Sequence, residues 1–88
     1  MLRAIDKTIS DKFKMKNLKY VIVIEKSKTG FGAYVPDLPG CVAVAKTKTE
    51  VKKLIKEGIE FHLEGMKSSG IKIPDPYSET MEVVVKVA

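Results

Sequence analysis

The chain is 88 residues long and carries a formal net charge of +5, with 44% hydrophobic and 31% charged residues. A chain of this length holds one hydrophobic core and therefore one domain. Its single cysteine excludes an internal disulfide and suits a reducing compartment. The longest apolar run, Tyr20 to Ile24, is far shorter than the ~20 residues that cross a membrane, and the N-terminus lacks the apolar segment of a secretory signal. We therefore expect a cytoplasmic protein that does not contact a membrane.

The first 18 residues form a basic extension, and the domain itself is expected at residues 19–88. Apolar residues recur at spacings of three and four between Leu2 and Phe13, which favours an amphipathic helix. The polar residues among them are equally compatible with an unstructured arm. The candidate nucleic-acid contacts are the lysines of this part of the chain: Lys7, Lys12, Lys14, Lys16 and Lys19. Such a cluster can bind phosphates, or it can be no more than a solvated arm.

Three strands are predicted in the first half of the domain. The run from Tyr20 to Ile24 is β-branched and aromatic, and it is apolar on both faces. A turn over residues 27–30 leads to a second strand from Phe31 to Val35, which should form an antiparallel hairpin with the first. A third strand is expected from Cys41 to Ala45.

A stiff loop separates the second and third strands. It contains Pro36 and Pro39, which fix φ near −65° and supply no amide donor, so neither fits inside a central strand. Gly40 can adopt the positive φ that lets the chain reverse. The pattern predicts a preset bend at one edge of the sheet, which is either a rigid turn alone or a contact surface.

A helix follows the third strand. Thr47 and Glu50 have the spacing of a capping box, and the apolar stripe continues to about Ser68, with Gly70 as the stop. Gly58 lies on that stripe, where we expect it to let the helix approach the sheet closely.

The chain closes with a proline-containing connector over residues 71–77 and a last strand over residues 81–87. The fold class is therefore α+β, a two-layer domain with an antiparallel β-sheet and one long helix in the order β-β-β-α-β. One helix covers only one face of a sheet, yet the first strand is apolar on both. The other face should be covered by residues 2–13 or by a second copy, and we predict a homodimer.

The residues with catalytic potential are sparse. One histidine and one cysteine without paired spacing argue against a metal site, so we expect no metal, no cofactor and no catalytic residues. Cys41 with His62, or Asp37 with a metal ion, would be the only basis for a residual hydrolase. A packed histidine and a small buried thiol are the ordinary interpretation of the first pair.

The motifs together resemble the HicB antitoxin family. The resemblance rests on strands at 20–25 and 30–35, on the segment Pro36-Asp37-Leu38-Pro39-Gly40-Cys41, and on the helix that Thr47 and Glu50 open and that contains Glu60-Phe61-His62-Leu63-Glu64. It covers about residues 19–76.

The resemblance implies a truncated ribonuclease H-like fold without the catalytic carboxylates. It also implies a partner toxin, HicA, which is a small mRNA interferase whose active site the antitoxin masks, and self-association. Many members carry a C-terminal DNA-binding element, and none fits between the last predicted strand and Ala88. The positive net charge also departs from the acidic character of many antitoxins.

The leading hypothesis is a non-enzymatic HicB-like antitoxin module that binds and masks a HicA-type toxin. The predicted partner-binding residues belong to the proline-containing loop and the strand before it: Tyr34, Pro36, Asp37, Leu38 and Pro39. A preset loop loses little entropy on binding, and the Asp37 carboxylate could meet a cation of the toxin. The alternative is a small basic nucleic-acid-binding domain that uses the N-terminal lysines.

Overall fold

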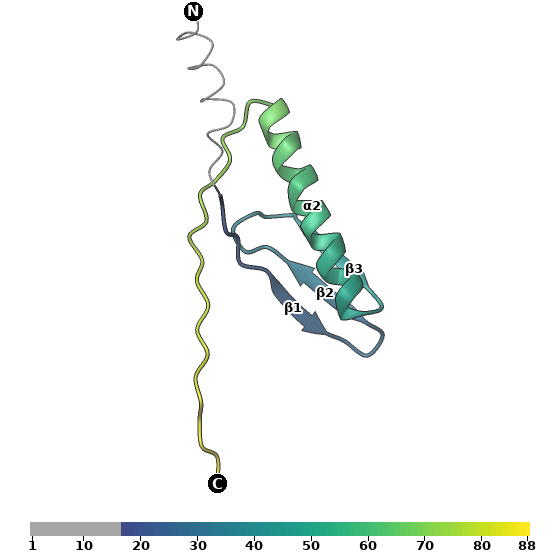
Figure 1. Ribbon diagram of the computed structural model, residues 1–88, viewed down its shortest axis with the longest axis vertical. Helices are drawn as coiled ribbons and strands as arrows, with labels where there is room; N and C mark the ends of the chain where they lie inside the picture. Colours follow the sequence, from purple (N-terminus) through teal and green to yellow (C-terminus); the bar gives the residue numbers. More distant parts are fainter. Residues whose placement is uncertain (1–16) are drawn as a thin grey trace, which may run out of the picture.

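The computed structural model describes residues 17–88 and contains three strands and one helix in these residues (Figure 1). The elements are β1 (Val23–Lys26), β2 (Phe31–Tyr34), β3 (Val42–Ala45) and α2 (Lys48–Ser68). The strands form one antiparallel sheet in the order β1-β2-β3, and α2 packs over β2 and β3. The predicted α+β class with two layers is confirmed. The amphipathic stretch expected between Leu2 and Phe13 lies outside the described residues.

The first strand begins later than predicted, because pairing with β2 stops where the loop begins. The β1–β2 register joins Val23 to Tyr34 and Lys26 to Phe31. Beyond Tyr34 the amide of Val35 already donates to the Cys41 carbonyl across the loop (3.3 Å), and the next residue, Pro36, has no amide. The residues between Tyr20 and Ile22 therefore precede β1 and have no antiparallel partner in β2.

The turn between β1 and β2 requires glycine at its last position. Ser27 donates its amide to the Gly30 carbonyl (2.8 Å), which closes the turn. A Cβ atom on Gly30 would overlap the carbonyl oxygen of Ala45, on the end of β3. The hairpin and β3 thus approach each other more closely than a side chain at position 30 would allow.

The helix begins and ends where its capping residues predict. Thr47 accepts the Glu50 amide through its hydroxyl oxygen (3.1 Å), and the Thr47 hydroxyl donates to the Glu50 carboxylate (2.9 Å). At the other end the amides of Gly70 and Ile71 donate to the Lys67 and Met66 carbonyls. With Gly70 at φ +73° this is a Schellman motif, which satisfies carbonyls that the helix leaves unpaired.

The core lies between α2, the helix-facing side of the sheet and the β2–β3 loop. Its fully buried apolar members are Ala33, Val35, Leu38, Cys41, Val51 and Ile55. A Cβ atom on Gly58 would lie 3.9 Å from the Cys41 sulfur, so this glycine does face the sheet side of the core. In the described part of the chain, no helix combines the length and the apolar character needed to cross a membrane.

The predicted last strand is not paired in this chain, which corrects the order β-β-β-α-β to β-β-β-α followed by an extended segment. Residues 71–88 contain no strand, and residues 79–88 lead away from the sheet (Figure 1). The sequence has the alternation of a strand, but a strand exists only when a neighbouring edge accepts its hydrogen bonds. That segment reaches no such edge among residues 17–88.

Two glycine substitutions should change stability in opposite directions. Gly58→Ala replaces a helical glycine where a methyl group makes only an ordinary contact, and it should raise the free energy of unfolding by about 0.5–1 kcal/mol. Gly30→Ala forces the hairpin away from β3 and should lower it by about 1–3 kcal/mol. Urea unfolding at one fixed protein concentration measures both. A stable Gly30→Ala variant would contradict the close approach to Ala45.

Candidate partner-binding surface

The β2–β3 loop is anchored from inside by apolar side chains. Val35 and Leu38 are only 2% and 1% exposed and fill the core beside α2. The backbone closes two turns on itself, because Leu38 donates to the Val35 carbonyl (3.0 Å) and Cys41 donates to the Leu38 carbonyl (3.1 Å). Gly40 has a φ of +87°, as predicted. The loop is thus rigid, and only part of it faces solvent.

The Asp37 carboxylate is buried, at 2% exposure, and it binds the segment that follows the helix. One oxygen accepts the amides of Tyr77 (2.9 Å) and Ser78 (3.0 Å), and the other accepts the Ser78 hydroxyl (2.5 Å). Burial acts to raise the pKa of Asp37, but these hydrogen bonds from Ser78 and Tyr77 outweigh it and hold the pKa below its ordinary value. The negative charge of Asp37 is therefore stabilised by hydrogen-bond donors of its own chain.

A second contact fixes the same segment. The Tyr20 hydroxyl donates to the Pro74 carbonyl, across 54 positions of sequence. Burial, and then the charges of Asp75 and Asp37, raise the pKa of Tyr20, so the hydroxyl keeps its proton and remains a donor. Residues 74–78 are thus held against the loop on one side and against the segment that leads into β1 on the other.

The sheet face opposite α2 is uncovered in the described residues and is largely apolar. Pairing places Val23, Tyr34 and Val42 in one row across the three strands. The next row on this face is formed by Glu25, Gly32 and Val44. Val42 and Val44 are 69% and 77% exposed, and Tyr34 is 40% exposed. We call the exposed side chains of Tyr34, Val42 and Val44 the reverse face.

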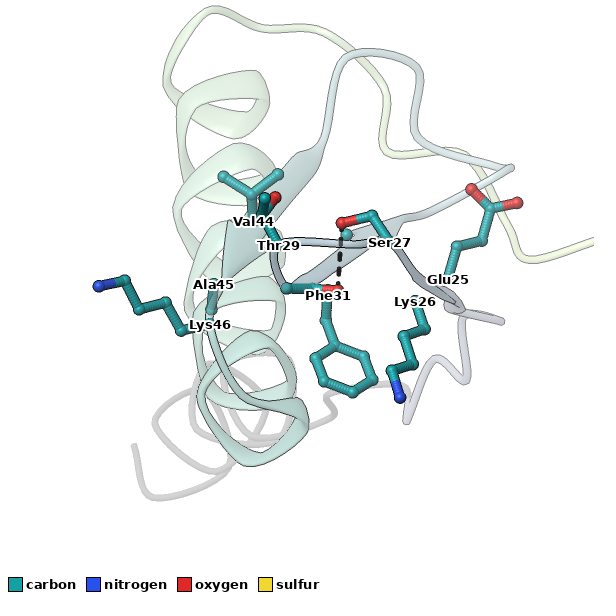
Figure 2. A pocket seen from close by; sticks show the side chains of 10 residues that line it. Glu25, Lys26, Ser27, Thr29, Phe31, Val44, Ala45 and Lys46 are labelled. Atoms are coloured by element: carbon teal, nitrogen blue, oxygen red, sulfur yellow. Dashed lines mark hydrogen bonds between the residues drawn. The ribbon is translucent and has the colours of Figure 1, made fainter.

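A shallow hollow of about 600 Å³ lies at the hairpin end of the sheet (Figure 2). It is lined by residues of the β1–β2 turn, of the strand ends beside it and of the end of β3, with Phe31, Gly32 and Val44 supplying its apolar part. The Ser27 hydroxyl donates to the Gly30 carbonyl (3.2 Å) and is occupied by that contact. Glu25, Lys26 and Lys46 supply the charged side chains around it.

The predicted partner-binding residues fall into two groups. Tyr34 and Pro39 are exposed and Pro36 is half-buried, so these three are accessible from outside. Asp37 and Leu38 lie inside the domain, and the Asp37 carboxylate, which was expected to be able to meet a cation of the toxin, instead accepts hydrogen bonds from its own chain. The loop turns Asp37 and Leu38 inward against the core and the 74–78 segment, and this buries both side chains. Sequence reasoning did not single out Val42 and Val44, although their alternation with two alanines carries the signal.

The residues weighed for catalysis offer little chemistry. Burial raises the pKa of the Cys41 thiol, which disfavours the reactive thiolate. His62 is half-buried on α2. Among residues 17–88 no three histidine, cysteine or carboxylate side chains are grouped to hold a metal ion. Lys19 is exposed, and the remaining candidate nucleic-acid contacts, Lys7, Lys12, Lys14 and Lys16, lie outside the described residues.

Comparison with known proteins identifies the family. Residues 20–86 match the family model described as the HicB-like antitoxin of bacterial toxin-antitoxin systems. The chain belongs to the HicB-like antitoxin family. The match begins at the segment that leads into β1 and includes the loop, α2 and most of residues 79–88.

Relatives of this HicB-like chain occur in archaea, bacteria and a phage. A UPF0150 protein of Thermoplasma acidophilum is 39% identical over 67 residues, which are 75% of this chain and 97% of that protein. A UPF0150 protein of Archaeoglobus fulgidus is 44% identical over 52 residues, 58% of this chain and 75% of its own length. A 14.9 kDa protein of Haemophilus phage HP1 is 42% identical over 55 residues, 62% of this chain, and the chain spans only 41% of that relative.

The fold also matches a solved structure. A chain in the structure described as the HicA3 and HicB3 toxin-antitoxin complex superposes with a TM-score of 0.59 at 32% identity. The superposition covers 68% of this chain and 70% of that one.

Removing the Asp37 charge should free the segment after the helix. In Asp37→Asn the two backbone donors of Tyr77 and Ser78 lose a charged acceptor, so their amides should exchange with solvent several-fold faster. Amide hydrogen exchange measured by NMR reports both positions. Ser78→Ala, which keeps the carboxylate and both amide bonds, is the matched control and should exchange only slightly faster.

The same interaction sets a pH dependence. Because the folded-state pKa of Asp37 lies below its ordinary value of 3.8, its contribution is complete at pH values well above 3.8. The contribution is lost as the pH falls through the lower folded-state pKa. Stability of the wild type should therefore decline below about pH 4 more steeply than stability of Asp37→Asn. Parallel acid profiles for the two proteins would contradict the ionised, hydrogen-bonded carboxylate.

Proposed function

We propose that this chain is a non-enzymatic antitoxin module that binds a HicA-type mRNA interferase and masks its active site. The observation that carries the proposal is the family match over residues 20–86, together with the likeness to a chain of a toxin-antitoxin complex. The absence of enzymatic activity is supported by two features: Asp37 is committed to backbone donors, and the Cys41 thiol is buried. The proposal places the protein in the cytoplasm, where an mRNA interferase acts.

The reverse face is the surface that we assign to the toxin. Tyr34, Val42 and Val44 expose apolar area on a sheet layer that no described residue covers. Contact residues of this kind, an aromatic side chain beside aliphatic ones, are typical of the desolvated centre of a protein interface. Pro36 and Pro39 would form the edge of that surface, and the loop that carries them is already rigid, so little order is lost on binding.

Charge makes an apolar contact the more suitable one for this chain. Its net charge is +5, so a basic partner gains nothing from long-range attraction to the protein as a whole. Binding must then come from burial of apolar area at close range, and the reverse face supplies it. Association should accordingly depend only weakly on salt.

The test is inhibition of RNA cleavage by the HicA-type protein encoded next to this chain. Val42→Asp combined with Val44→Asp should weaken toxin binding about 100-fold or more, since burying each valine contributes roughly 1.5 kcal/mol and each 1.4 kcal/mol is tenfold in affinity. Calorimetric titration and an RNA cleavage assay measure the two effects. Phe61→Asp is the matched control, because Phe61 is 82% exposed on α2 in the other layer.

The outcomes separate the function from the surface. If the wild type neither binds the toxin nor protects RNA, the proposed function is wrong. If the wild type inhibits and the paired valine variant inhibits equally well, the function stands and the reverse face is not the contact surface. Equal losses in the valine variant and in Phe61→Asp would indicate a general defect of folding, which circular dichroism detects.

A further inference from the structure

Residues 79–88 are extended and largely apolar, and they pair with no strand in the part of the chain that the structure describes. We call residues 79–88 the tail. Its apolar members are highly exposed: Met81 84%, Val83 64%, Val84 97%, Val85 69% and Val87 88%. Met81, Val83, Val85 and Val87 lie on one side of an extended chain, and Val84 adds an apolar side chain on the other side, so the segment is β-branched and apolar as strands are. The tail projects from the body of the domain (Figure 1).

The β1 edge of the sheet has unpaired backbone groups that a strand such as the tail could bind. β1 pairs with β2 on one side, and within the described residues no strand pairs with its other side. The segment that leads into it, from Tyr20 to Ile22, is apolar and half-buried. An open edge of this kind presents a row of unpaired backbone donors and acceptors and is a template for another strand.

The tail starts from a fixed point beside that edge. The Asp37 carboxylate holds the amides of Tyr77 and Ser78, and the Tyr20 hydroxyl holds the Pro74 carbonyl. Tyr20 lies three residues before β1, so the anchors place the root of the tail next to the β1 side of the sheet. From there the tail leads outward instead of returning along β1 (Figure 1).

We propose that the tail of one copy pairs with the β1 edge of a second copy as its fourth strand, and that the exchange is reciprocal. A second copy is the occupant that fits, because among residues 17–88 of each chain no strand pairs with the β1 edge and no edge pairs with the tail. In a two-fold dimer the tail of each copy pairs with the β1 edge of the other. Both tails and both edges are then paired, so no further copy is added. A toxin seated on either feature would leave the other one open.

This contact is distinct from the reverse face and does not depend on the proposed function. The tail adds to the sheet in its own plane by backbone hydrogen bonds, whereas Tyr34, Val42 and Val44 project out of that plane. The dimer therefore leaves the reverse face free for a partner of another kind.

The test measures mass and backbone pairing together. The full chain should have a mass twice its 9.8 kDa by sedimentation equilibrium, and the amides of residues 81–87 should be protected from hydrogen exchange. Val83→Pro combined with Val84→Pro removes two adjacent amides, one of which must face the partner edge, and should give a monomer. Val83→Thr with Val84→Thr keeps both amides and the preference for strands, and it should remain a dimer.

Mixing two differently labelled copies identifies the strand that is paired. With ¹⁵N on one copy and ¹³C on the other, cross-peaks should join tail amides to residues of β1 across the two chains. A monomer with a protected tail would mean that the tail closes on its own edge, and the proposal would be wrong. A monomer with an unprotected tail, or a dimer that survives the proline substitutions, would overturn it equally.

Discussion

A single buried carboxylate connects the parts of this small domain that are distant in sequence. Asp37 lies in the middle of the proline-containing loop, 40 and 41 positions before the two residues whose amides it accepts. A carboxylate so deeply buried is costly unless hydrogen bonds satisfy it, and here three donors do so. The loop must therefore keep its shape for residues 77–78 to dock, and those residues must dock for the loop to hide its charge. The rigidity of the loop and the path of the C-terminal segment therefore depend on the same hydrogen bonds to Asp37.

The two-layer arrangement explains where interaction surfaces arise. One helix packs over β2 and β3, and it buries Val51 and Ile55 against the inner side of the sheet. Nothing in the described residues covers the other side, so Tyr34, Val42 and Val44 face solvent although their side chains are apolar. A single domain of this size gains little net stability from so small a core. Exposed apolar area of this kind is typical of a chain that completes its burial in a complex.

The described residues leave two kinds of surface without a partner, and the two differ in geometry. The reverse face offers side chains and suits an apolar surface of another protein. The tail and the β1 edge offer backbone groups, which only another strand can satisfy. Because the two surfaces are orthogonal, the proposed contact between two copies and the proposed contact with a different protein do not compete for the same surface. The proline-containing loop lies between them and holds both in place through its contacts with the core and with residues 74–78.

Local chemistry made much of the fold predictable from the sequence. The Thr47–Glu50 capping box, the stop at Gly70, the turn at Gly30 and the reversal at Gly40 each depend on residues close in sequence, and each is found where predicted. The family resemblance likewise rests on a contiguous loop and its spacing to a helix. Tertiary structure alone decided that the Asp37 carboxylate points inward, because its donors lie some forty residues away. It also decided that residues 81–87 find no neighbouring strand among the described residues, since a β-branched sequence favours a strand but only the arrangement of the chain in space supplies the edge with which it pairs.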